Sequence, residues 1–178
     1  LLQEQIEGDD YRMLFIDKKY VATIRRSPAA VTGDGTSTVR QLIEKENLNP
    51  LRGSNYEKSM EYISLEAAGA YLGETLDSHI PEAGESYRVV GVANLGSGGS
   101  AQDVTDSVPE IMKQHAEKLV TELNMGICGV DFMWTGREED TAYVIEINAT
   151  PGIDMHDDPL FGTPRGAISS LVDYLLSE

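Results

Sequence analysis

Short segments in which β-branched and aromatic residues predominate predict the β-strands of this chain. Tyr11 to Ile16 and Tyr20 to Arg25 are two such segments, and the polar stretch Asp17-Lys18-Lys19 between them suits a turn. Tyr87 to Leu95 predicts a further strand, and Leu1 to Gly8 predicts the end of a strand that passes into a turn. The first two segments therefore form a predicted β-hairpin.

Four other segments have apolar residues spaced three and four positions apart, as in amphipathic helices. They are the segment that Ser37 is expected to cap, Tyr62 to Leu72, Ser107 to Asn124 and a closing helix after Thr163-Pro164. In the third, Ser107 and Glu110 form a predicted capping box, and His115 is expected to pack in the core or at its boundary. The sides expected to be buried carry Val39, Leu42 and Ile43 in the first helix and Ile168, Leu171, Val172 and Leu175 in the last.

A second hairpin is predicted near the C-terminal end of the sequence. Ile127 to Trp134 and Thr141 to Ile147 have the composition of strands, and Thr135 to Asp140 between them is polar and contains a glycine. Because side chains alternate between the two faces of a strand, Glu146 and Asn148 lie on the same face. This alternation predicts a cluster of polar side chains on one face of the hairpin.

Asp131, on the first strand of this hairpin, can face Glu146 and Asn148 across the ladder. Oxygen ligands without His or Cys favour a hard cation, and Mg²⁺ is the default when the protein offers only two or three oxygens. The spacing leaves a second interpretation open, in which the carboxylates are solvated and Asn148 only opens the turn at Pro151-Gly152. On spacing alone the pattern is thus a metal-site hypothesis.

The composition indicates a globular chain of 178 residues, of which 40% are hydrophobic. No apolar run approaches the ~20 residues of a membrane helix. The net charge of −16 repels nucleic acid and acidic membranes, and it also repels ATP unless arginines and metal ions offset it locally. The single Cys128 excludes an internal disulfide, is expected to be a buried structural thiol, and fits a cytoplasmic protein.

Several motifs resemble those of the ATP-grasp superfamily. GVDF at Asp131 and EINATPG from Glu146 are similar to the metal-binding end of these enzymes. GDGTSTV from Gly33, the segment Asn49 to Gly53, and NLGSGG from Asn94 further resemble cyanophycin synthetases and the ATP-grasp half of bifunctional glutathione synthetases. The resemblance implies an α+β fold, namely the C-terminal lobe of an ATP-grasp domain, with a mostly antiparallel sheet and flanking helices.

The resemblance also implies which residues hold the nucleotide and the metal. Asp131, Glu146 and Asn148 would hold one or two Mg²⁺ ions, with Mn²⁺ as the alternative ion, against the phosphates of ATP. The segment Gln3 to Ile6 is similar to the ATP-grasp hinge, whose backbone binds the adenine edge, and Asp10 would bind the ribose hydroxyls. Asn94, just before the glycine-rich loop, would also contact the nucleotide. These cofactor-binding residues are Gln3, Glu4, Ile6, Asp10 and Asn94.

Catalytic roles are implied for Arg12, Arg26, Gly98 and Gly99. A guanidinium pairs well with phosphate or acyl-phosphate oxygens, although most arginines in any sequence are surface residues. The glycines would let a loop close over the terminal phosphate, whereas a Gly-Ser run by itself is typical of a flexible loop. Substrate-side positions are Arg88, Gly152 and His156.

No lysine matches the phosphate-holding lysines of the family's preceding lobe, so residues 1–178 are expected to be the C-terminal portion of an ATP-grasp domain without its N-terminal lobe or pre-ATP-grasp domain. The absence of an initial Met likewise suggests a fragment.

The implied reaction is ATP- and Mg-dependent carboxylate–amine ligation through an acyl phosphate. Small carboxylates, amino acids or peptides would be the substrates, the missing lobe would be the partner, and self-association is left open. The alternative is an inactive nucleotide-binding or cation-binding regulatory module.

Overall fold

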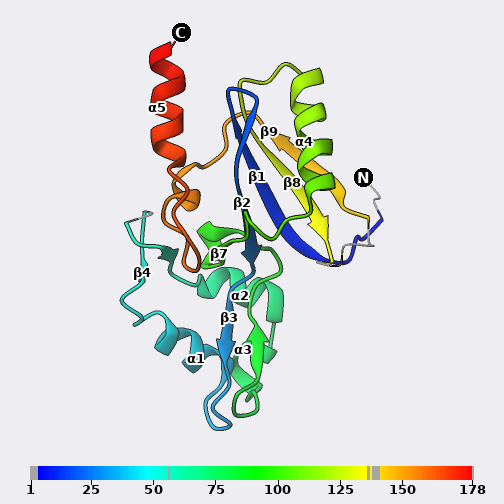
Figure 1. The fold of residues 1–178 in the computed structure, drawn as a ribbon. Coiled ribbons are helices and arrows are strands. Elements are labelled where there is room, and N and C mark those ends of the chain that lie inside the picture. The colour runs from blue at the N-terminus through cyan, green and yellow to red at the C-terminus, as the bar shows by residue number, and fades with distance from the viewer. Residues whose placement is uncertain (1–3, 56, 136, 138–140, 178) are drawn as a thin grey trace. The chain divides into compact units, whose positions relative to one another are not determined.

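A computed structural model describes residues 4–55, 57–135, 137 and 141–177. The chain divides into two compact units (Figure 1), the first made of Leu1–Arg25 with Ala101–Glu178 and the second of Arg26–Ser100. Each unit has its own hydrophobic core and is considered by itself below.

A five-stranded sheet in the order β7-β2-β1-β8-β9 forms the centre of the first unit. Its strands are β1 (Asp9–Ile16), β2 (Lys19–Ser27), β7 (Ser100–Asp103), β8 (Ile127–Trp134) and β9 (Tyr143–Asn148). β8 pairs antiparallel with both β1 and β9. The predicted α+β class with a mostly antiparallel sheet is confirmed, and so are both predicted hairpins.

The turn between β1 and β2 is set by two residues with positive φ, Asp17 at 52° and Lys18 at 59°. Two central residues of that kind give the backbone twist that matches a tight hairpin. The expected strand before β1 is not found among residues 4–8, which form no strand, and Leu1 to Gln3 lie outside the described residues.

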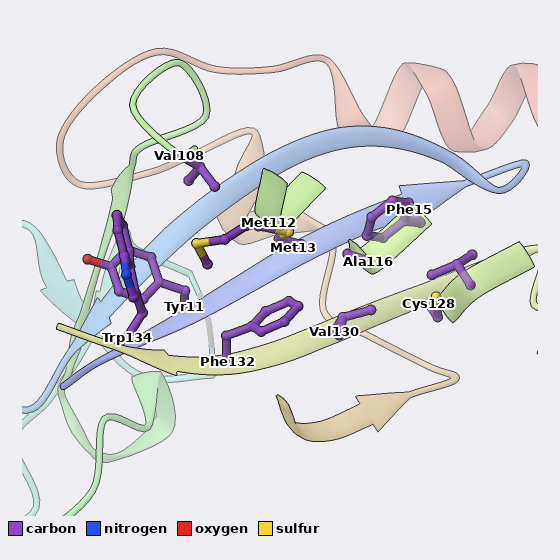
Figure 2. Close-up of a cluster of buried hydrophobic side chains, with 11 residues drawn as sticks. Tyr11, Met13, Phe15, Val108, Met112, Ala116, Cys128, Val130, Phe132 and Trp134 are labelled. Carbon is purple, nitrogen blue, oxygen red and sulfur yellow. The ribbon is translucent and has the colours of Figure 1, made fainter. Parts of the chain in front are cut away.

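The main core of the first unit lies on one face of β1 and β8. Figure 2 shows alternate residues of both strands in one cluster with Met112 and Ala116 of helix α4 (Glu110–Glu122), which packs against this face. Cys128 is fully buried here, and burial raises the pKa of its thiol, which fits the structural role expected for it. The cluster comprises Tyr11, Met13, Phe15, Val108, Met112, Ala116, Val120, Cys128, Val130, Phe132 and Trp134.

Helix α4 is shorter than predicted and begins differently. Pro109 is its N-cap residue and makes no side-chain cap bond, while the Ser107 hydroxyl donates to the Val104 carbonyl at 3.0 Å. The predicted capping box is therefore wrong, because the hydroxyl bonds to the preceding turn instead of to the helix. His115 is exposed, and Ala116 takes the buried position on that helical turn.

Helix α5 (Ala167–Ser177) packs against part of the opposite face of the sheet, at the end of β1 that carries Leu14 and Ile16. Both oxygens of Asp157 accept bonds from its first turn, from Ala167 N at 2.6 Å and Ile168 N at 2.8 Å. The helix therefore begins three residues after Pro164 and turns Ala167, Leu171 and Tyr174 towards Leu14 and Ile16. Of the side expected to be buried, Ile168, Val172 and Leu175 are exposed instead. Within the described residues, no helix is long and apolar enough to span a membrane.

The second unit consists of short elements around a separate core. They are β3 (Ala30–Thr32), α1 (Val39–Glu46), β4 (Arg52–Gly53), β5 (Met60–Glu61), α2 (Leu65–Leu72), α3 (Thr75–Ser78), β6 (Ser86–Arg88) and the 3₁₀ turn η1 (Leu95–Ser97). β3 pairs antiparallel with β6, and β4 pairs in parallel with β5. The predicted stripe of α1, Val39 with Leu42 and Ile43, is buried in this core.

Element boundaries in the second unit differ from prediction in three places. Thr38, not Ser37, caps α1, because the Asp34 carboxylate engages Ser37 through both its backbone and its hydroxyl. Helix α2 begins only after Ser64, whose hydroxyl caps it. The strand expected up to Leu95 ends at Arg88, after which Val89 bonds to the Ala29 carbonyl and the chain leaves the ladder.

Candidate functional site

Three of the predicted site residues form a row across the sheet of the first unit. Arg12 on β1 lies opposite Asp131 on β8, and Asp131 lies opposite Glu146 on β9. Directly opposed residues share a face, so all three side chains point away from the core beneath α4. Asn148, opposite Gly129, is on the same face two residues along the ladder. The strand register thus brings Asp131, Glu146 and Asn148 together on one face of the sheet, as predicted.

Arg12 and Asp131 form a bidentate ion pair. Nε and one terminal nitrogen of Arg12 each donate to a different Asp131 oxygen, both at 2.7 Å. The side chains are 9% and 7% exposed, so the pair is nearly excluded from solvent. Burial alone would lower the pKa of Arg12, but the bonds and charge of Asp131, with the charges of Asp10 and Glu146, outweigh burial and raise it. Arg12 is therefore a permanent cation within this row.

Gly129 and Asn148, which lie opposite each other on β8 and β9, shape the surroundings of the Arg12–Asp131 pair. A Cβ on Gly129 would lie 3.0 Å from Pro151 Cβ and 3.3 Å from the Arg12 side chain, so the missing side chain makes room for both. Asn148 Oδ1 accepts a bond from Thr150 N at 2.9 Å and so opens the turn towards Pro151. The turn-opening role left open for Asn148 is present, and the Thr150 hydroxyl also donates to the same oxygen at 3.5 Å, a long bond that a metal ion bound there would replace.

The donor set suits a hard divalent cation. It offers carboxylate oxygens from Asp131 and Glu146 and the amide oxygen of Asn148, with no nitrogen or sulfur ligand. In the part of the chain that the structure describes, no group of three His, Cys, Asp or Glu could hold a metal, so the amide is needed as the third ligand. Arg12 offsets one of the two carboxylate charges. These residues fit an Mg²⁺ ion that takes its remaining ligands from water or phosphate.

The predicted nucleotide segment borders a hollow of its own in the first unit. Glu4 and Ile6 line a space of about 430 Å³ together with Thr135, Thr141 and Tyr143. Asp10 lies on β1 opposite Met133, on the same face as Arg12 two residues along. Gln3 falls outside the described residues. The adenine and ribose roles remain predictions for these positions.

The predicted glycine-rich loop is a tight turn in the second unit. Asn94 caps η1, its side-chain oxygen accepting from Gly96 N at 3.0 Å, and Gly98 ends the turn with φ of 88°. A Cβ on Gly98 would lie 2.8 Å from Ile63 Cα, and one on Gly99 would lie 2.7 Å from the Ser27 carbonyl oxygen. Both glycines are thus required by close packing, and the segment is a defined turn rather than an open linker.

Replacing Gly98 with Ala should destabilise the protein by about 2–4 kcal/mol, because positive φ and steric overlap with Ile63 backbone add together. Gly84→Ala is the matched control, since Gly84 also has positive φ, of 84°, but has open space around its Cβ position. It should cost only about 1–2 kcal/mol. Thermal unfolding of both variants tests this, and equal losses would show that the contact with Ile63 is not tight.

The remaining predicted arginines of the second unit have different surroundings. Arg26 lies near the end of β2 and is half-buried. Arg88 donates from Nε to the Val90 carbonyl at 2.8 Å, and its guanidinium lies 6.0 Å from the centre of the Tyr71 ring. A second bond, to the Gly91 carbonyl, helps to fold the chain after β6, and the substrate role of Arg88 remains a prediction.

Gly152 and His156 lie in the first unit, on the segment that follows β9. His156 belongs to the 3₁₀ turn η2 (Asp154–His156) and is 1% exposed, so its ring is part of the interior. Arg165 N donates to the His156 carbonyl at 3.1 Å, and the Arg165 side chain forms an ion pair with Asp103. This Arg165–Asp103 pair fixes the segment beside β7, and no residue pattern had indicated it.

Arg52 is a second residue whose contacts no residue pattern had indicated. It lies within the motif Asn49 to Gly53, is 7% exposed, and donates to the Gly98 carbonyl at 2.9 Å. The sequence offered one sign of this role, namely that Arg52 precedes Gly53 in a segment that resembles the bifunctional glutathione synthetases. Its partner is 46 positions away, and no local periodicity indicates such a contact.

Comparison with known proteins shows two groups of relatives. The bifunctional glutathione biosynthesis protein of Listeria welshimeri is 33% identical over 180 residues, covering 98% of this chain and 23% of that protein. Cyanophycin synthetase of a Nostoc species is 35% identical over 184 residues, covering 98% of this chain and 20% of that protein. No protein-family model matches.

Among solved structures, a bifunctional glutathione synthetase from Pasteurella multocida superposes with a TM-score of 0.75 at 27% identity, covering 98% of this chain and 25% of that chain. The chain therefore spans about a fifth to a quarter of the length of the relatives it matches. These matches confirm the predicted resemblance of this chain, over nearly its whole length, to bifunctional glutathione synthetases and cyanophycin synthetases.

Proposed function

We propose that residues 1–178 are the C-terminal portion of the ATP-grasp domain of an ATP- and Mg²⁺-dependent carboxylate–amine ligase. The observation that carries the proposal is the row Arg12, Asp131 and Glu146, in which a buried cation lies beside two carboxylates on one face of the sheet. Relatives named for glutathione biosynthesis and cyanophycin synthesis support a reaction that forms peptide-type bonds. Small carboxylates, with amino acids or short peptides as amines, are the proposed substrates.

In the proposed reaction a carboxylate oxygen attacks the γ-phosphorus of ATP, and ADP leaves. The amine nitrogen then attacks the acyl carbon, loses a proton, and inorganic phosphate leaves. A bound Mg²⁺ would supply charge neutralisation for the phosphates, held by Asp131, Glu146 and Asn148. Arg12 uses two of its five N–H groups on Asp131, which leaves others for phosphate or acyl-phosphate oxygens.

Isothermal titration of the intact protein with ATP tests this function. We expect heat of binding in the presence of Mg²⁺ and a loss of affinity of at least about tenfold when EDTA removes the ion, since the carboxylates repel the phosphates without it. Formation of ADP and phosphate that depends on a carboxylate and an amine would identify the ligase. Metal binding that is indifferent to nucleotide would instead identify a cation-binding module.

A further inference from the structure

A buried arginine joins three parts of the second unit at one point. The Arg52 side chain is 5% exposed, and its Nε donates to Glu46 Oε1, at the end of α1, at 3.0 Å. One terminal nitrogen donates to two carbonyl oxygens, that of Glu61 in β5 and that of Gly98 in the glycine-rich turn, both at 2.9 Å. A single guanidinium thus ties the turn to a helix end and a strand.

The turn itself is closed by bonds among its own residues. Gly96 N donates to the Asn94 side chain, while Ser97 N and Gly99 N both donate to the Asn94 carbonyl, at 3.1 and 3.2 Å. Gly98 N donates to the Leu95 carbonyl at 3.0 Å. These bonds fix the internal shape of the turn, whereas the bond from Arg52 to the Gly98 carbonyl connects it to the rest of the unit.

We propose that Arg52 is a positioning residue that holds the glycine-rich turn through the Gly98 carbonyl, without touching substrate itself. A charge-assisted bond in a buried place is stronger than a neutral one, and a planar fork can satisfy Glu46, Glu61 and Gly98 at once. Lysine has the charge but lacks the fork, so it cannot reproduce the three directions. The consequence for catalysis rests on the proposed ligase function, in which this turn closes over the reacting phosphate.

Hydrogen exchange of the intact protein, measured by mass spectrometry, tests the structural part. In Arg52→Lys and Arg52→Met, amides of residues 95–99 should exchange about 10- to 100-fold faster than in the wild type, while the helix α2 keeps its protection. Arg40→Lys is the matched control, because Arg40 forms an exposed bidentate pair with Asp77 in the same unit. It should leave exchange in the turn unchanged.

Kinetics separate a positioning role from a general effect on folding. The Arg52→Lys enzyme should lose about 10- to 100-fold in kcat while KM for ATP changes less than about twofold. Unchanged exchange in the turn, or accelerated exchange with wild-type kcat, would overturn the proposal. So would accelerated exchange throughout the second unit in Arg52→Lys. If the wild type has no ligase activity, the proposed function fails, whereas the exchange result still decides whether Arg52 holds the turn.

Discussion

Glu146→Gln in the intact protein is expected to lower the rate of carboxylate–amine ligation by about 100-fold or more, with little change in thermal stability. Glutamine keeps the size of the side chain but removes the negative charge that would hold Mg²⁺ beside the phosphates. Glu146 is exposed on the edge strand β9, so the substitution should change the unfolding free energy by no more than about 0.5 kcal/mol. Steady-state turnover and a melting curve of the same preparation measure both effects.

Glu122→Gln provides the matched control for this loss. Glu122 is an exposed carboxylate at the end of α4, where its contact with Lys118 is a surface pair at 3.9 Å. Its substitution should leave turnover and Mg²⁺-dependent ATP affinity unchanged. Wild-type turnover in Glu146→Gln would contradict the metal role. Asp131→Asn is a less selective test, because it also disturbs the buried pair with Arg12.

The candidate metal face could be predicted because a polar loop and the two-residue periodicity of a strand determine it. A polar loop between two β-rich segments predicts a hairpin, and the two-residue alternation puts Glu146 and Asn148 on one side. The β-bulge between Asp131 and Phe132 lies just beyond the opposed pair Asp131–Glu146 and leaves that pair in register. Local sequence information was therefore sufficient for this part of the site.

The pairing of Arg12 with Asp131 could not be predicted in the same way. The two residues are 119 positions apart, and they meet only because β1 pairs with β8 rather than with β2 alone. The resemblance implied a phosphate or acyl-phosphate role for Arg12, but no local pattern pointed to its carboxylate partner. Arg52 and Gly98 are a second instance, since their contact depends on how β4, β5 and the turn pack.

Helix ends were predicted less well than strands because competing local bonds decide them. Ser107 has the residue type and spacing of a cap, yet its hydroxyl bonds to Val104 and the helix begins after Pro109. Asp157, ten residues before Ala167, caps α5 from a distant turn. Each of these outcomes depends on a tertiary or loop geometry that periodicity does not contain.

Arg12→Met should destabilise the first unit by about 3–5 kcal/mol, a shift in melting temperature of roughly 6–20 °C. The substitution removes both 2.7 Å bonds from a carboxylate whose side chain is only 7% exposed, so its charge must be accommodated in the interior or reach solvent by a local opening. Calorimetry of the intact protein measures the shift, and hydrogen exchange of β8 amides assigns it to this sheet. Lys118→Met, which breaks an exposed pair, should cost less than about 1 kcal/mol.

Comparison of a double variant with Arg12→Met separates the cost of leaving a buried charge unpaired from the cost of lost packing. In Arg12→Met with Asp131→Leu, no buried charge remains in the pair, so the double variant should be more stable than Arg12→Met alone by about 1–3 kcal/mol. The carboxylate would then be present for its function and not for stability, which agrees with its proposed place beside a metal ion. A double variant no more stable than the single one would show that the cost of Arg12→Met is lost packing over Gly129, where the Arg12 stem lies 3.3 Å from the Cβ position.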